Sequence, residues 1–124
     1  WQVLAADESG LPAAAAIAEQ TPDSLPTVLY AEVPTDNDVL PLAVGPHVTV
    51  RWFPRNDHDR IPGSLLHEEL TRTELPGSGR GSVLLVGESA FATGVRRHLV
   101  NSLGVPKADI TFFGYWKHGK ASLG

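Results

Sequence analysis

The segment VLLVGES, residues 83–89, ends an apolar run at Gly-Glu-Ser, directly before a helical pattern. Ser89 at such a strand-to-helix turn could be the nucleophile of a serine hydrolase, because the turn exposes the serine hydroxyl. The same turn could instead lie at the carboxyl end of a parallel strand, where α/β proteins bind nucleotides. The two interpretations predict unrelated chemistry.

The hydrolase interpretation requires a G-x-S-x-G turn and two triad partners. Gly87 and Ser89 match this pattern, but Phe91 stands in place of the second glycine. Asp109 and His118 follow in a permitted chain order, yet Asp109 falls at the start of its predicted strand, at the opposite edge of the sheet from Ser89. No oxyanion-hole segment is recognisable. We therefore favour Ser89 as a cap of the following helix.

The nucleotide interpretation depends on polar residues at the ends of three other apolar runs. Residues 6–12 read ADESGLP and lack the G-x-G-x-x-G fingerprint. Asp7 and Glu8 suit a helix N-terminus but would repel a pyrophosphate, so a cap role and a site role are about equally supported. Glu32 ends the second run, where a carboxylate often accepts from a ribose hydroxyl. Arg55, just past the third run, could hold a 2′-phosphate.

Short apolar runs that alternate with helical or irregular stretches must position these residues. Strands are predicted at residues 1–6, 27–33, 47–54, 82–87 and 107–116, helices at 11–20, 64–75 and 89–104, and a loop crossover at 34–46. We expect Ser64 to cap the second helix and Gly104 to end the third. Nearly continuous apolar strands indicate a parallel sheet covered on both faces. The expected fold class is α/β: a doubly wound, mostly parallel sheet of about five strands with helices on both faces.

Composition narrows the functional class. The chain has 124 residues, enough for one domain with a core, and its net charge of −4 argues against a general nucleic-acid binder. No apolar run approaches the roughly 18 residues that would cross a bilayer, so we expect no direct membrane insertion. Without cysteine, neither a disulfide framework nor a thiolate metal site can form. Because methionine is absent and the chain begins at Trp1, we expect a domain excised from a longer protein.

The residues at the end of the chain give a more specific indication of function than the composition does. FFGYWKHGK, residues 112–120, resembles the GYW[RK]xG ending of the siderophore-interacting proteins, the flavin-dependent ferric-siderophore reductases. ADESGLPAAAAI resembles their first turn, usually GDETALPAI, and VTVRWFPR resembles a strand that ends in Trp, two residues and Arg. LLVGESAFATGVRRHL is similar to their AGEAS segment with its arginine-rich helix. Order and spacing agree over nearly the whole chain.

The resemblance implies a C-terminal, ferredoxin-reductase-like domain that receives NADPH or NADH, in a longer protein whose N-terminal barrel holds FAD. In that family, hydride passes to the flavin and single electrons pass to the Fe(III) of a siderophore, which then releases iron. We expect residues 1–124 to be a single NAD(P)H-binding domain, inactive alone, with the FAD-binding domain of its parent chain and a ferric siderophore as partners. The expected location is cytoplasmic, at the inner face of the membrane where the parent is fused to a siderophore importer.

The resemblance, added to the reasoning above, also gives expected roles for individual residues. The expected cofactor-binding residues are Asp7, Glu8, Ser9, Glu32, Arg55, Gly87, Glu88, Ser89 and Trp116. Lys117 and Lys120 are expected to attract anionic ferric siderophores. No catalytic residue and no metal ligand is expected in this chain. Ser89 is then a cap or a polar contact on the nucleotide side.

Departures from the family pattern support an alternative. Ala6 replaces the usual glycine before the Asp, His118 replaces a second arginine, and Val86 stands where related reductases often have Cys. The acidic first turn and Ala6 are also compatible with a non-catalytic binding or assembly domain, for example within an importer fusion. Such a domain would keep the fold and lose nucleotide affinity.

Overall fold

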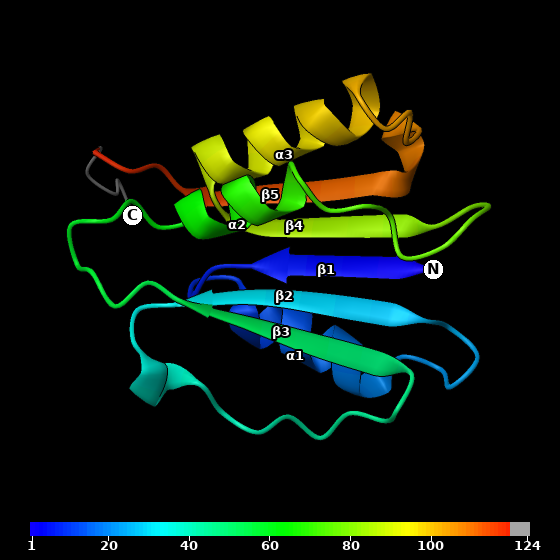
Figure 1. Cartoon of the computed structure of the whole chain (residues 1–124), viewed down its shortest axis with the longest axis horizontal. Coiled ribbons are helices and arrows are strands. Elements are labelled where there is room, and N and C mark those ends of the chain that lie inside the picture. The colour runs from blue at the N-terminus through cyan, green and yellow to red at the C-terminus, as the bar shows by residue number, and fades with distance from the viewer. Residues whose placement is uncertain (120–124) are drawn as a thin grey trace.

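The computed structural model describes residues 1–119, which form one five-stranded parallel sheet with helices on both faces (Figure 1). The strands are β1 (Gln2–Ala6), β2 (Thr27–Val33), β3 (Val48–Pro54), β4 (Ser82–Glu88) and β5 (Ile110–Trp116). The helices are α1 (Leu11–Gln20), α2 (Ser64–Leu70) and α3 (Ser89–Asn101), with 3-10 turns η1 (Asp36–Asp38) and η2 (Lys107–Asp109). The predicted α/β, doubly wound fold is confirmed.

The strand order is β3-β2-β1-β4-β5, and β1 lies at its centre. Gln2 pairs with Thr27 of β2 on one side and with Ser82 of β4 on the other. The chain leaves β1 through α1 to build β2 and β3, then returns through α2 to build β4 and β5. The direction of winding therefore reverses between β1 and β4, which is where open α/β sheets usually bind ligands.

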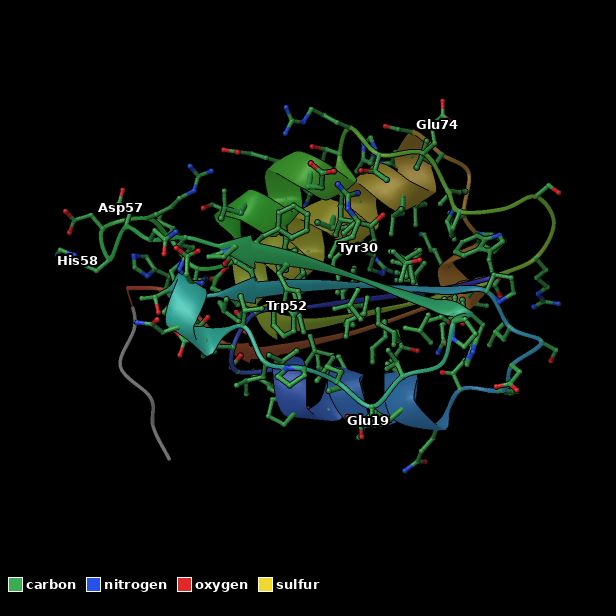
Figure 2. The ribbon with its side chains drawn as sticks, turned by 60° about the horizontal axis from the view of Figure 1, so that its bottom comes forward. Glu19, Tyr30, Trp52, Asp57, His58 and Glu74 are labelled. Atoms are coloured by element: carbon green, nitrogen blue, oxygen red, sulfur yellow. The ribbon has the colours of Figure 1, made fainter. Side chains whose placement is uncertain are left out.

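Each face of the sheet has its own apolar core, and the sequence pattern explains both. Figure 2 shows α1 on one side of the sheet and α2 and α3 on the other. Ala14 and Ala18 of α1 pack against Leu4, Ala6 and Leu29, and these small side chains let the helix lie close to the strands. Larger residues of α2 and α3, among them Leu66, Phe91, Val95 and Leu99, fill the opposite core.

Helix α2 differs from the prediction at both ends. It begins at Ser64 as its first residue, so Ser64 is not its N-cap; Gly63 holds that position with a φ of 90°. It ends at Leu70 rather than at residue 75. At this end the hydroxyl of Thr71 donates to the carbonyls of His67 and Glu68, which satisfies acceptors of the last helical turn.

Helix α3 begins as predicted and ends three residues early, at Asn101. Ser102 is its C-cap, and the predicted terminator Gly104 lies beyond it with a φ of 69°. The amide of Val105 then donates to the carbonyl of Leu99, which closes the turn that leads to β5. The crossover at residues 34–46 is a loop as predicted, apart from the short turn η1.

Candidate functional site

The carboxyl ends of all five strands meet at one edge of the sheet, at the left of Figure 1. Across this edge the strand order places Arg55 after β3, Glu32 on β2, Asp7 after β1, Glu88 on β4 and Lys117 after β5. Residues that are far apart in sequence therefore form one row. The parallel topology explains why the ends of the predicted apolar runs share this edge.

Asp7 lies in the crevice between β1 and β4 and is fully buried. Its Oδ1 accepts from the amide and the hydroxyl of Ser9, at 2.9 and 2.5 Å, and from the amide of Gly10 at 3.4 Å. Its Oδ2 accepts from the amide of Glu88 at 2.9 Å. One carboxylate thus closes the turn that starts α1 and joins that turn to the end of β4.

Gly87 is the residue that lets Asp7 reach β4. Its φ is 151°, and a Cβ at this position would lie 2.5 Å from Oδ2 of Asp7. Real Cβ atoms do not approach oxygen so closely, so only glycine fits here. The glycine of the VGES motif therefore makes room for an internal carboxylate at the place where a nucleotide was expected.

Glu32 is also fully buried and binds the start of α2. Its Oε1 accepts from the amides of Leu65 and Leu66, at 2.8 and 3.3 Å, and its Oε2 accepts from the amide of Gly63. Arg55 donates to Oε2 at 2.7 Å. The carboxylate that was predicted to accept from a ribose thus has four internal donors. Its proposed contact with a ribose stays a prediction.

Glu88 caps α3 and holds the segment after β5. Its Oε2 accepts from the amide of Phe91 at 3.0 Å, and its Oε1 accepts from the amide of His118 at 3.1 Å. The prediction that Ser89 caps this helix is wrong, because Glu88 is the N-cap and Ser89 is the first helical residue. Ser89 instead makes a polar contact: its hydroxyl donates to the carbonyl of Trp116 at 3.0 Å.

Two of these carboxylates occupy helix N-termini. In α/β proteins the amide groups and the dipole at a helix N-terminus commonly bind a phosphate. In the described residues, α2 receives the buried carboxylate of Glu32 and α3 that of Glu88, whereas Asp7 bonds to the turn that precedes α1. The chain therefore supplies its own anions at the starts of α2 and α3, and these two helix ends do not fit a pyrophosphate as they stand.

Arg55 lies between two carboxylates. Its Nη1 donates to Oε1 of Glu8 at 3.1 Å as well as to Glu32, and its Nη2 donates to Oε2 of Glu8. Burial lowers the pKa of Arg55, but hydrogen bonds and the charges of Glu8 and Glu32 outweigh burial, so the pKa is raised above the ordinary arginine value. The guanidinium is therefore charged at any physiological pH. Sequence reasoning did not connect Glu8 with Arg55, because they are 47 residues apart.

A hollow of about 430 Å³ opens beside this ion pair. Glu8, Thr35, Arg55, His58 and Arg60 are among its lining residues. Figure 2 shows His58, with Asp57, at the end of the molecule beyond β3. A second hollow of about 300 Å³ lies between the starts of α2 and α3, and Pro62 lines both. The first hollow is within the volume range of small-molecule sites, and charged and polar side chains form most of its lining.

The end of β5 is built differently. Phe113 and Tyr115 are 50% and 55% exposed, and Lys117 is exposed just after the strand. The backbone on either side of Lys117 is held by the bonds from Ser89 to Trp116 and from His118 to Glu88. Gly114 is needed here because a Cβ would lie 2.5 Å from the hydroxyl of Ser89. Trp116 is half-buried, and Lys120 lies outside the described residues.

Among residues 1–119, no three or more His, Cys, Asp or Glu side chains are grouped so that they could hold a metal ion. None of the described helices is long and apolar enough to cross a membrane.

The fold is that of an α/β domain of the nucleotide-binding type, and buried carboxylates lie at the carboxyl ends of its strands. The profile of the siderophore-interacting protein family matches residues 1–119, and the chain belongs to this family. A siderophore utilization protein from T. fusca shares 33% sequence identity with it at a TM-score of 0.84, over 99% of this chain and 47% of the other. The siderophore-interacting protein SipS from Aeromonas hydrophila shares 28% at a TM-score of 0.82, over 97% and 47%.

Two further relatives are matched over only part of their own length. The ferric vibriobactin reductase ViuB of Vibrio cholerae is 26% identical over 97% of this chain and 44% of its own length. The mycobactin import ATP-binding/permease protein IrtA of Mycobacterium tuberculosis is 29% identical over 96% of this chain and 13% of its own length. The chain thus spans less than half the length of each of these relatives. A siderophore-related role is supported by the family and by both names.

Proposed function

We propose that this chain is the NAD(P)H-binding half of a flavin-dependent ferric-siderophore reductase. The observation that carries the proposal is the family match over residues 1–119, together with a relative named as a ferric vibriobactin reductase. The rest of the parent chain would contain the FAD-binding domain, and the ferric siderophore would be the substrate. The parent would act in the cytoplasm, either free or fused to an importer.

Different residues along the strand edge would bind different parts of the cofactor and the substrate. The hollow lined by Glu8, Arg55 and Arg60 would bind the adenosine end of the nucleotide. The turns at Asp7 and Gly87 hold the centre of the edge rigid, because Asp7 bonds to the amides of both turns. A bound nicotinamide supplies a hydride, which a flavin in the rest of the parent chain can pass on as single electrons.

The end of β5 would face the ferric siderophore. Lys117 is exposed, and the backbone on either side of it is anchored to Ser89 and Glu88, so its flexible side chain extends from a held position. Many ferric siderophore complexes are anionic, and an exposed cation attracts them by Coulomb forces. Phe113 and Tyr115 add exposed aromatic surface on the same strand, which suits the apolar parts of a chelate.

One observation favours a second candidate function, that of a binding or assembly domain without catalysis. The carboxylates at the N-termini of α2 and α3 occupy the usual anion positions, which reduces the affinity expected for a pyrophosphate there. A domain that had lost nucleotide binding would keep these structural bonds and still present Lys117 to a ferric siderophore.

Rapid mixing of the intact parent protein, loaded with FAD, separates the two functions. Anaerobic addition of NADH or NADPH should bleach the flavin absorbance, and later addition of an anionic ferric siderophore should restore it and release Fe(II) to a chelating dye. A flavin that stays oxidised with both nucleotides, in protein that still binds the ferric siderophore, would favour the assembly domain. The 124-residue chain alone should show no reduction of the ferric siderophore.

A further inference from the structure

Glu8 covers the guanidinium that sequence reasoning assigned to the 2′-phosphate of NADPH. Both carboxylate oxygens of Glu8 bond to Arg55, one to each terminal nitrogen. The side chain of Arg55 is only 6% exposed in this arrangement. A phosphate needs the same pair of N–H groups, because bidentate contact is the strong geometry for arginine. Glu8 and a 2′-phosphate therefore compete for one position.

The two carboxylates on Arg55 differ in their freedom to move. Glu32 has a fully buried side chain and accepts from three backbone amides at the start of α2, so its displacement would unpair that helix end. The side chain of Glu8 is 37% exposed and reaches Arg55 from the turn after β1. Glu8 is the partner that can exchange with a ligand.

The charge around the hollow also opposes a dianion. Glu8 and Glu32 together exceed the single positive charge of Arg55, and Arg60 is paired with Glu68 at 2.5 Å and bonded to Ser64 at 2.9 Å. A ribose hydroxyl has no such difficulty, since it donates to a carboxylate. In dinucleotide-binding folds a carboxylate is the usual partner of the free ribose 2′-hydroxyl of NADH.

We propose that Glu8 makes this chain select NADH over NADPH, accepting from the ribose 2′-hydroxyl of NADH and excluding the 2′-phosphate of NADPH from Arg55. This inference rests on the proposed nucleotide-binding function and deepens it. The proposal gives a specific partner to Glu8, which the family resemblance placed among the expected cofactor-binding residues. It also transfers the expected ribose contact from the inaccessible Glu32 to Glu8.

The test compares 5′-AMP with 2′,5′-ADP, two probes that differ by the 2′-phosphate. Each is titrated into the 124-residue chain and followed by amide chemical shifts, for the wild type, Glu8→Gln and Glu8→Ala. Glu19→Gln is the matched control, because it removes the same charge from an exposed residue of α1 (Figure 2). Backbone spectra of the unliganded variants verify that each has kept its fold.

The wild type and Glu19→Gln should bind 5′-AMP at least as tightly as 2′,5′-ADP, with shifts around Glu8 and Arg55. Both Glu8 variants should change the ratio of the two affinities at least about tenfold in favour of 2′,5′-ADP. An unchanged ratio in folded Glu8 variants, or a wild type that already prefers 2′,5′-ADP, would overturn the selection by Glu8 and leave nucleotide binding intact. No shifts with either probe, in any variant up to about 10 mM, would overturn the nucleotide site itself.

Discussion

The carboxyl ends of β1, β2 and β4 differ sharply from the carboxyl end of β5. The first three end in the buried carboxylates Asp7, Glu32 and Glu88, and every one of these accepts from backbone amides of a following helix or turn. The end of β5 has Tyr115 more than half exposed and Lys117 open to solvent. Polar residues at the same sheet edge therefore lie in two different environments.

This difference teaches how to separate structural from recognition residues at one edge. A buried carboxylate with several internal donors stabilises the fold, and removing it leaves those donors unsatisfied. An exposed cation next to exposed aromatic rings contributes little to stability and is available to a ligand. Substitutions in the first region should lower the free energy of unfolding, and substitutions in the second should change binding only.

The largest loss is expected for Glu32→Ala, which removes four hydrogen bonds and leaves the buried Arg55 with one carboxylate fewer. The free energy of unfolding should fall by about 3–5 kcal/mol, measured by urea denaturation. Glu68→Ala is the control: its side chain is 57% exposed and pairs with Arg60, so it should cost at most about 1 kcal/mol. Equal losses in the two variants would contradict the structural role of Glu32.

Asp7→Asn should have the next largest effect. The amide group of asparagine cannot accept at both positions, so either the amide of Glu88 or the donors from Ser9 and Gly10 lose their partner. We expect a loss of about 2–3 kcal/mol in the free energy of unfolding. Asp23→Asn changes a fully exposed carboxylate in the same way and should leave the urea midpoint unchanged. A midpoint of Asp7→Asn equal to that of the wild type would show that the turn does not need the charge.

Gly87→Ala tests whether close approach to Asp7 is needed. The new Cβ would overlap the Asp7 carboxylate and the backbone has a φ of 151°, so we expect a loss of about 2 kcal/mol in unfolding free energy. Gly104→Ala also has a positive φ, of 69°, but open space around the position. It should lower the free energy of unfolding by about 1 kcal/mol. The difference between the two variants in urea denaturation then gives the cost of the overlap with Asp7. No difference would mean that Asp7 moves aside freely.

Lys117→Ala should have the smallest effect on stability, within about 0.5 kcal/mol, because the side chain is exposed. In the intact parent protein it should raise the KM for an anionic ferric siderophore about 3- to 10-fold and leave the KM for the nicotinamide nucleotide unchanged. Lys107→Ala, which removes an exposed cation from η2 before β5, is the control and should change neither. Equal changes in both KM values for Lys117→Ala would remove its proposed substrate role.

Much of the fold was predictable because its signals are local. The strand β2 was predicted at residues 27–33 and is observed there, since a nearly continuous run of apolar residues indicates a strand buried on both faces. Helix α1 likewise begins after Gly10 with Pro12 in its first turn, as expected for proline. The family was identified from short motifs whose order is also a property of the sequence alone.

The helix caps were not predictable in the same way. Ser64 and Ser89 have the residue type and the sequence position of N-caps, yet Glu32 binds the start of α2 and Glu88 the start of α3. A serine cap can be inferred from the residues beside the helix start, whereas Glu32 binds the amide of Leu65 from 33 residues away. A buried charged group gains more from backbone amides than a hydroxyl does, and that gain appears only when β2 and α2 lie side by side.

The sequence by itself determined the alternation of strands and helices, the parallel sheet that follows from it and the edge at which the polar residues gather. Tertiary structure alone decided which of those residues are buried in internal hydrogen bonds and which stay exposed. Asp7 and Glu8 are neighbours of the same charge, but folding buries Asp7 against the end of β4 and leaves Glu8 half-exposed on Arg55. Periodicity in a sequence reports local geometry, whereas the pairing of a charge depends on contacts between segments distant in the chain.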